Sequence, residues 1–94
     1  MDKRFKNIII NCLMDYQPEM IGIFGSYARN ESRHDSDIDI LVRFKSALSL
    51  LQLVHIELIL SQKLGKKVDL LTEGALKNHK IKENILQDLI IIYK

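Results

Sequence analysis

The sequence predicts an α/β or α+β fold in which helices cover a small β-sheet. Runs rich in apolar and β-branched residues at 20–24, 37–44 and 66–71 are typical of short strands. Segments with apolar residues at helical spacing precede, separate and follow these runs. No internal repeat, low-complexity segment or long linker is visible, so we expect residues 1–94 to form a single domain.

The first half of the chain is expected to begin with a helix. Apolar residues recur at helical spacing over residues 5–16, and Pro18 ends that pattern. The run at 20–24 then predicts a buried strand. A single helical turn is expected from Ser26, a residue type suited to an N-cap, and the polar segment 31–36 is typical of a turn before the second strand.

The second half is dominated by a helix predicted over about residues 47–64. Its apolar surface is wide, which favours packing on more than one partner, and Gly65 stands in the position expected of a C-cap. After the third strand, residues 72–80 indicate a loop that can hold one helical turn, and residues 81–89 indicate a last helix. The apolar end, 89–94, fits a strand, a helix end or an interface equally well.

Composition excludes several classes of protein. The net charge of +2 is too small to indicate binding to nucleic acid or to an anionic membrane, and no basic stripe is interleaved with aromatic residues. The apolar N-terminal stretch is interrupted by Asn11 and Asp15 and is too short for a signal peptide or a membrane span. We therefore expect a soluble, cytoplasmic protein.

Three aspartates are the candidate catalytic and metal-binding residues. Asp37 and Asp39 are two positions apart in a predicted strand, so their side chains leave on the same face. Asp69 lies in another predicted strand and can join them if the two strands pair. Carboxylate oxygens are the ligands that Mg²⁺ prefers, and three of them can hold two ions about 3.5–4 Å apart. Any one such aspartate could instead cap a strand or face solvent.

The Gly-Ser pair that follows the first strand is a candidate phosphate-binding element. Gly25 lets a phosphate approach the backbone, and a helical turn beginning at Ser26 would point its free N–H groups at that phosphate. Arg29 could neutralise a triphosphate or could be a solvated surface residue. Ten residues separate Ser26 from Asp37, enough to return the chain to the same sheet edge.

The spacing of "GS" at 25–26, ten residues, and "DID" at 37–39 resembles the GS-x10-D-x-D signature of the DNA polymerase β-like nucleotidyltransferase superfamily. The segments "FGSYAR", "DSDIDILV" and "KKVDLLTEGAL" are similar to consecutive blocks of its minimal, MNT-type members, so the likeness runs from about Ile21 to the last predicted helix. Asn30 stands where relatives often have glycine, and asparagine tolerates a left-handed backbone better than most residues.

The resemblance implies a small mixed sheet with flanking helices, two Mg²⁺ ions, and transfer of a nucleoside monophosphate, with ATP as the expected substrate, to a hydroxyl group. By position, it implies that Gly25 and Ser26 bind the nucleotide phosphates and that Asp37 and Asp39 hold both metals. Asp69 would help to hold the catalytic metal and orient the attacking hydroxyl. Many members of the family are antitoxins encoded beside a HEPN-domain ribonuclease toxin, and some inactivate it by adding AMP to a tyrosine.

Two functions from different classes remain open at this point. The first is an Mg²⁺-dependent protein adenylyltransferase whose partner, a HEPN-domain toxin, supplies the acceptor hydroxyl. The second is a non-catalytic antitoxin that neutralises a toxin by contact, with the apolar C-terminal segment as its interface. The complete set of aspartates favours catalysis, and the sequence does not determine the oligomeric state.

Overall fold

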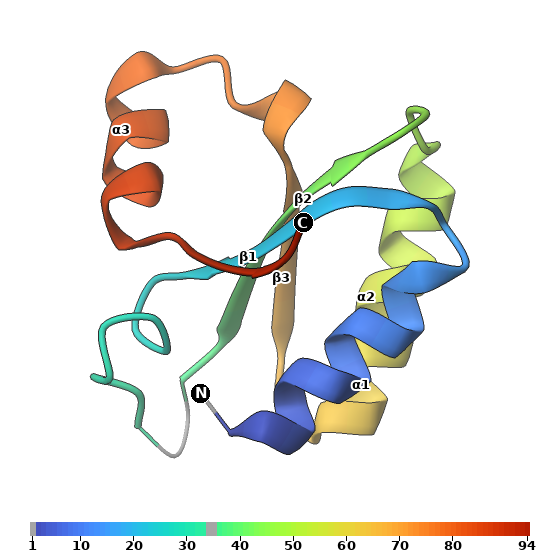
Figure 1. Ribbon diagram of the computed structural model, residues 1–94, viewed down its shortest axis with the longest axis horizontal. Helices are drawn as coiled ribbons and strands as arrows, with labels where there is room; N and C mark the ends of the chain where they lie inside the picture. Colours follow the sequence, from blue (N-terminus) through green and yellow to red (C-terminus); the bar gives the residue numbers. More distant parts are fainter. Residues whose placement is uncertain (1, 34–35) are drawn as a thin grey trace.

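The computed structural model describes residues 2–33 and 36–94, which form helices and one β-sheet (Figure 1). His34 and Asp35, inside the connection predicted to be a polar turn, lie outside the described residues. The elements are α1 (Lys3–Met14), β1 (Pro18–Phe24), β2 (Ile38–Phe44), α2 (Leu50–Leu64), β3 (Val68–Thr72), the short 3₁₀ helix η1 (Glu73–Ala75), α3 (His79–Asp88) and β4 (Ile90–Tyr93).

The sheet is mixed, as the resemblance implied, with the strand order β3-β2-β1-β4. β1 pairs antiparallel with both β2 and β4, whereas β2 and β3 run parallel. In this register Asp39 of β2 lies beside Asp69 of β3 on one side and beside Phe24 of β1 on the other. The predicted pairing of the two strands that carry aspartates is therefore present.

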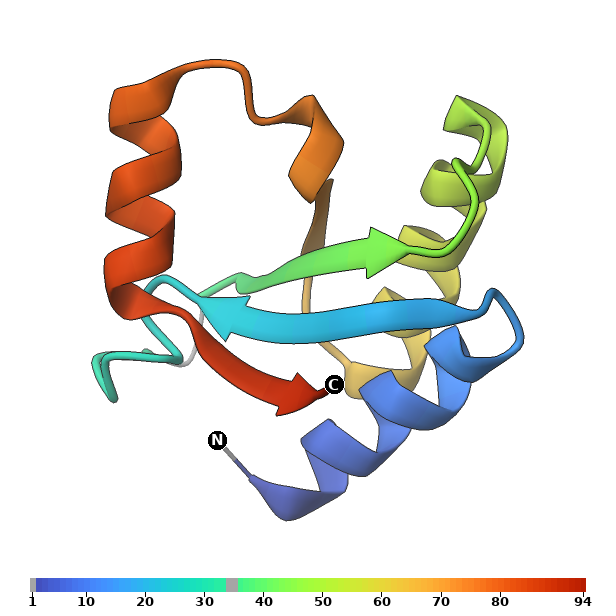
Figure 2. The ribbon, with the colours of Figure 1, turned by 45° about the horizontal axis from the view of Figure 1, so that its top comes forward.

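The two faces of the sheet are covered unequally (Figures 1 and 2). α1 and α2 lie on one face, and the main core there is built from buried side chains of these helices and of β1, β2 and β3. α3 lies over the other face and contributes one buried residue, Ile85, to a smaller cluster with Met20 and Leu41. The site described below lies on this more open face.

Local signals explain where the long helix starts and stops. Ser49 and Gln52 form a capping box, since the Ser49 Oγ accepts from the Gln52 N–H at 3.1 Å and the Gln52 Oε1 accepts from the Ser49 N–H at 2.9 Å. α2 therefore begins at Leu50, three residues later than expected. Gly65 adopts φ = 67° and caps the helix end, so the predicted C-cap is confirmed.

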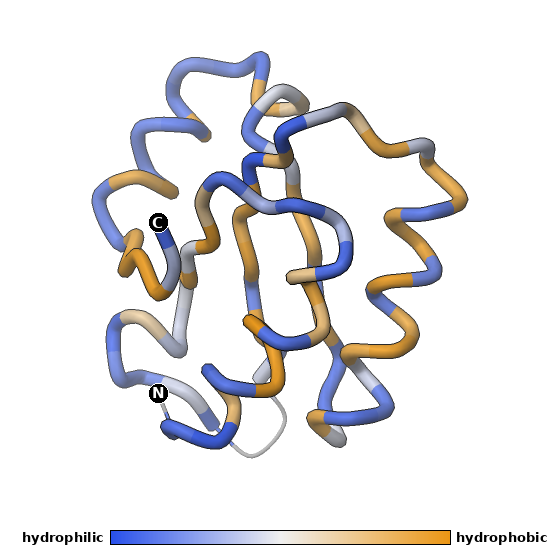
Figure 3. The backbone as a smooth tube through the Cα atoms, turned by 45° about the vertical axis from the view of Figure 1, so that its right-hand side comes forward, coloured by the Kyte–Doolittle hydropathy of each residue, from blue (hydrophilic) through white to orange (hydrophobic). Residues whose placement is uncertain are grey.

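The wide apolar surface of α2 is partly used inside this chain. α2 contacts both α1 and β3, as its breadth predicted, through a buried face that includes Ile56 and Leu60. Four aliphatic side chains on its outer side remain exposed: Leu50, Leu51, Val54 and Leu58. The tube coloured by hydropathy shows how apolar α2 is along its length, in contrast with α3 (Figure 3).

Several predicted boundaries are shifted. The first helix occupies Lys3–Met14, and Pro18 opens β1 instead of lying between two elements. β2 begins at Ile38, so Asp37 precedes the strand and was wrongly placed inside it. The ambiguous C-terminal segment is an edge strand paired with β1. Across the described residues, none of the helices is long and apolar enough to span a membrane.

Candidate active site

Asp39 and Asp69 form the centre of the candidate site. They are register partners on adjacent parallel strands, and both side chains are half-buried. Burial, together with the negative charges of Asp69 and Asp37 and a side-chain hydrogen bond with Asp69, raises the pKa of Asp39 to about 6. Two carboxylates that repel one another in this way favour a cation or a shared proton between them.

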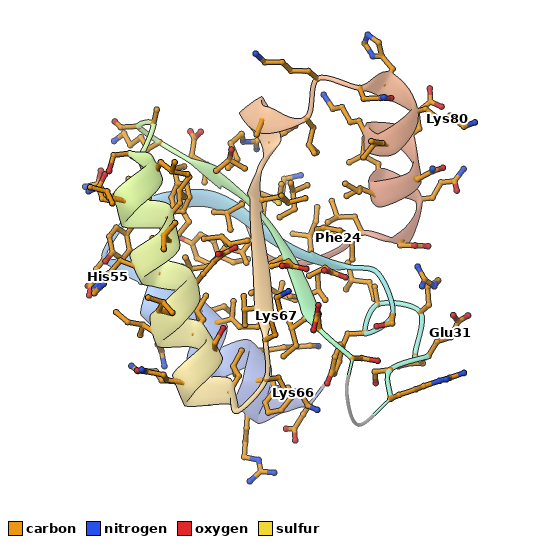
Figure 4. The ribbon with its side chains drawn as sticks, turned by 180° about the vertical axis from the view of Figure 1, so that it is seen from behind. Phe24, Glu31, His55, Lys66, Lys67 and Lys80 are labelled. Atoms are coloured by element: carbon orange, nitrogen blue, oxygen red, sulfur yellow. The ribbon has the colours of Figure 1, made fainter. Side chains whose placement is uncertain are left out.

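Asp37 lies one residue before β2, and its carboxylate is placed differently from the other two. Its Oδ2 is 4.0 Å from the Nζ of Lys67, which precedes β3 (Figure 4). Its charge reaches Asp39, because it contributes to the raised pKa of that residue. Within residues 2–33 and 36–94, no group of three or more acidic, His or Cys side chains is arranged to hold a metal ion.

Gly25 directly follows β1 and lies against the Asp39 carboxylate. Its φ of 74° is in the left-handed region that glycine adopts without strain. A Cβ built at this position would collide with the Oδ2 of Asp39. The Asp39 carboxylate therefore occupies the space that the missing side chain leaves, and the Gly-Ser turn and the aspartate are packed as one unit.

The segment after Gly25 contains the single helical turn predicted from Ser26, closed by one i→i+4 hydrogen bond, and then continues as turns without becoming a helix. The Arg29 N–H donates to the Gly25 carbonyl at 3.1 Å, and the Glu31 N–H donates to the Ser26 carbonyl at 2.9 Å. Asn30 has φ = 57°, so it adopts the left-handed conformation that its residue type was expected to tolerate. Tyr27 is buried in the main core and anchors the turn.

Arg29 points across the site to α3. Its Nη1 donates to the Oδ2 of Asp88 at 2.6 Å, and its Nε donates to the Oε2 of Glu31 at 3.2 Å. These hydrogen bonds, with that to Asp88 the stronger, raise the pKa of Arg29, and its positive charge in turn works to lower the pKa of Asp39. Arg29 is thus a fixed cation facing the acidic centre.

A cavity of about 220 Å³ brings these groups together. Gly25, Arg29 and Asp39 line one part of it, and side chains of α3 line the other part. Phe24 and Glu31, on β1 and on the loop that follows it, can be located in the view with side chains (Figure 4). The α3 residues at this cavity are Ile81, Asn84, Ile85 and Asp88.

Sequence reasoning missed the α3 side of the site. Asp88 is 59 residues from Arg29, and no local pattern connects the two. The one available signal was an acidic residue at the end of a helix, where the helix dipole disfavours negative charge. Glu31 and Lys67 were also unassigned, since charged residues in a polar loop or before a strand are normally solvated.

A larger cavity, of about 580 Å³, lies at the opposite end of β2. Arg43, Glu73 and Lys82 are among its lining residues, and none of the predicted site residues is. Size alone would select it as the binding site. Asp39, Gly25 and Arg29 line the smaller cavity, and these residues instead identify it as the chemical centre.

The residues present fit a divalent cation in part. Asp39 and Asp69 supply neighbouring carboxylate oxygens of the kind that Mg²⁺ prefers, and their mutual repulsion is the electrostatic condition that a cation relieves. Gly25, which follows β1, lines the cavity together with Asp39 and Arg29. Asp37 is close enough to influence Asp39 electrostatically but is nearest to a lysine.

Comparison with known proteins assigns the family. Residues 6–92 match the nucleotidyltransferase domain family. The chain is 48% identical over 77 residues to a Methanocaldococcus jannaschii protein provisionally named a protein adenylyltransferase. The aligned residues make up 82% of this chain and 79% of that protein. It is 42% identical over 72 residues to the protein adenylyltransferase MntA of Thermococcus cleftensis, covering 77% and 72% of the two chains.

Solved structures share the same architecture. A structure described as a candidate minimal nucleotidyltransferase has a TM-score of 0.79 and 31% identity, with 94% of this chain and 89% of that chain covered. A toxin–antitoxin structure with AMP-PNP has a TM-score of 0.85 at 24% identity, covering 94% and 72%. A complex of tri-AMPylated Shewanella oneidensis HEPN toxin with MNT antitoxin has a TM-score of 0.80 at 23% identity, covering 99% and 72%.

The chain belongs to the nucleotidyltransferase family and is a nucleotidyltransferase of the minimal type. The predicted resemblance, the fold class and the assignment to an enzyme class are confirmed. A nucleotide substrate follows at the level of the family. The roles of Asp37, Asp39, Asp69, Gly25 and Ser26 stay predictions.

Proposed function

We propose that the protein transfers AMP from ATP to a tyrosine hydroxyl of a HEPN-domain toxin and thereby acts as its antitoxin. One observation carries the chemistry: Asp39, whose register partner is Asp69, lines the same cavity as Gly25 and Arg29. The relatives named as protein adenylyltransferases support the reaction, and the complexes of HEPN toxins with MNT antitoxins support the partner.

The reaction needs an acceptor oxygen, a departing pyrophosphate and a place for one proton. The hydroxyl oxygen forms a bond to the α-phosphorus of ATP, and the bond from that phosphorus to the oxygen bridging to the β-phosphate breaks. Asp69 accepts the hydrogen bond of the attacking hydroxyl and takes its proton. The Gly25–Ser26 turn contacts the phosphates of ATP, and Arg29 binds them through its positive charge.

Mg²⁺ is the proposed cofactor: the neighbouring carboxylates of Asp39 and Asp69 would hold it, and Asp37 would join them by turning away from Lys67. When bound, two such ions neutralise phosphate charge and activate the attacking oxygen. The protein supplies the fixed positions: Asp39 is locked against Gly25, and Asp69 is fixed by its register beside Asp39. The proposed use of ATP also leads us to place the protein in the cytoplasm. We further propose that residues 1–94 act as one domain.

The direct test uses the purified chain, a HEPN-domain partner, Mg²⁺ and ATP labelled at the α-phosphate. We expect label on a tyrosine of the partner, with a mass increase of one AMP per site. Asp39→Asn should abolish transfer because it removes a carboxylate at the centre of the site. Asp15→Asn makes the same chemical change at the exposed end of α1 and should leave transfer intact.

Failure of the wild-type chain to label any partner protein with any nucleoside triphosphate would contradict the proposed activity. Equal transfer by Asp39→Asn and Asp15→Asn would contradict the assignment of the site. Chelation of divalent ions with EDTA should stop transfer, and added Mg²⁺ should restore it.

Neutralisation by contact is the second candidate. Ile90 and Ile91 of β4 are about half exposed, at 47% and 48%, so the C-terminal segment presents the apolar side chains that this alternative requires. The double variant Asp37→Asn and Asp39→Asn separates the two functions. Full protection of cells from the toxin by this variant would favour contact, and loss of protection would favour AMP transfer.

A further inference from the structure

Arg29 is held from two sides by carboxylates that come from different parts of the chain. Asp88 binds its Nη1 at 2.6 Å, and Glu31 binds its Nε at 3.2 Å. The Asp88 side chain is 28% exposed and that of Glu31 is 66% exposed, so the contact with Asp88 is the better shielded of the two. Two anchors on different nitrogens restrict the orientation of the guanidinium, although the Arg29 side chain is 42% exposed.

Asp88 stands where a carboxylate is unfavourable on its own. It is the last residue of α3, at the negative end of the helix dipole, and the last turn contains no basic residue. Arg29, which comes from the turn after β1, provides the compensating positive charge. A function that Asp88 exerts through Arg29 would explain why a carboxylate stands at this unfavourable position.

The anchoring leaves one end of the guanidinium available. Among the described residues, no hydrogen bond is made by the Nη2 of Arg29. Arg29, Asp88, Asp39 and Gly25 all line the same cavity, and the charge of Arg29 acts on Asp39. A phosphate oxygen entering beside Gly25 can therefore meet an Nη2 whose orientation has already been set.

We propose that Asp88 is a positioning residue, which holds Arg29 in the orientation that binds the phosphates of ATP. The proposal rests on the function proposed above and extends the site to α3. Because the arginine is oriented before ATP arrives, less side-chain freedom is lost on binding. Removal of Asp88 should weaken ATP binding and leave the chemical step almost unchanged.

A double-mutant cycle tests this proposal. We expect Asp88→Ala and Arg29→Ala each to raise the KM for ATP and the Kd for AMP-PNP by about 5- to 20-fold, with kcat changed by less than about threefold. The double variant should bind no more weakly than Arg29→Ala, because Asp88 acts through Arg29. Asp88→Glu, which keeps the charge, should recover part of the affinity.

The matched control breaks a comparable ion pair elsewhere. Glu73 pairs with Arg43 at 3.3 Å, and its side chain is 29% exposed, close to the value for Asp88. This pair lies at the opposite end of β2. Glu73→Ala should leave KM and Kd within twofold of the wild-type values, and the thermal melting of each variant shows whether it is folded.

Asp88→Ala with unchanged nucleotide affinity would overturn the proposal, as would additive effects of Asp88→Ala and Arg29→Ala. If Asp88→Ala fails to fold, Asp88→Asn, which keeps the shape, takes its place in the cycle. The Kd for AMP-PNP tests the role of Asp88 independently of catalysis. A wild-type chain that binds AMP-PNP but transfers no AMP would refute the proposed function. The Kd values of the double-mutant cycle would then still test whether Asp88 positions Arg29. A wild-type chain that binds no nucleotide would refute both.

Discussion

At the scale of single residues, Gly25 and Asp39 depend on each other. Gly25 has a positive φ, and the space that its side chain would fill is taken by the Asp39 carboxylate. Either condition alone would favour glycine, and here both apply. The glycine of the Gly-Ser motif is therefore required by the position of the neighbouring aspartate as well as by any phosphate that approaches it.

Gly25→Ala should impair catalysis far more than folding. The new Cβ would push the Asp39 carboxylate from its place, and a displacement of about 1 Å can reduce a reaction rate about 100-fold. The control is Gly65→Ala, which also introduces a side chain at a positive φ, 67°, but with no atom within 4 Å of the new Cβ. Both variants should lose about 1 kcal/mol of stability in urea denaturation, from backbone strain.

Only Gly25→Ala should lose AMP transfer in the labelled-ATP assay. If Gly65→Ala lost as much activity, strain and not the collision with Asp39 would be responsible.

At the scale of elements, α2 secures the outer edge of β3. Ser61 accepts a hydrogen bond from the Val68 N–H at 3.1 Å, and Glu57 accepts one from the Leu70 N–H at 2.8 Å. These two N–H groups flank Asp69 on the side of the strand that faces away from β2. An edge strand otherwise leaves such groups unpaired, so the helix both covers this edge and fixes the segment that carries Asp69.

Glu57→Ala should lower the free energy of unfolding by about 1–3 kcal/mol, because it leaves the half-buried Leu70 N–H without its partner. Glu57→Gln keeps an acceptor oxygen at the same distance along the side chain and should cost less than about 0.5 kcal/mol. Urea denaturation followed by circular dichroism measures both values. Equal losses in the two variants would show that the charge, and not the hydrogen bond, stabilises the strand.

Elements with a local signal were predictable from the sequence, and those decided by a distant partner were not. The β-branched runs of β1, β2 and β3 locate these strands, and Gly65 marks the end of α2. The capping box of Ser49 and Gln52 was a local signal for the start of α2, but the apolar pattern, which begins at about residue 47, led to an earlier predicted start. The three isoleucines of β4 contain no such signal, because pairing with β1 decides their conformation.

The candidate site divides in the same way. Asp39 and Asp69 were predictable as neighbours, since two strands with an embedded carboxylate each belong to one small sheet. The position of Asp37 outside β2 was not, because a strand boundary one residue later changes no apolar pattern. Asp88 required the path of α3 across the open face, which follows from tertiary packing.

At the scale of the whole molecule, the site lowers the stability of the metal-free protein at neutral pH. The pKa of Asp39 is raised from 3.8 to about 6 by burial and by the neighbouring negative charges, so the folded state binds this proton more tightly than the unfolded state. The stabilisation from the protonated form is complete below pH 3.8. It is lost as the pH rises through about 6.

In EDTA, Asp39→Asn should therefore be more stable than the wild type above pH 6 and nearly equal to it at pH 4. Since Asp39 is half exposed, we expect a gain of about 1 kcal/mol at pH 7.5, well below the value that an unscreened shift would give. Urea denaturation at the two pH values measures it, with Asp15→Asn as the control. A gain of the same size at pH 4 would contradict the electrostatic origin.

The unequal cover of the two faces has a mechanical consequence. The paired aspartates are carried by strands fixed to the main core, whereas α3 is attached mainly through Ile85 and through the Asp88–Arg29 contact. The free energy of local opening should therefore be smallest at α3. The acidic half of the site therefore belongs to the part of the molecule that is hardest to open, and Asp88 belongs to the part that is easiest to open.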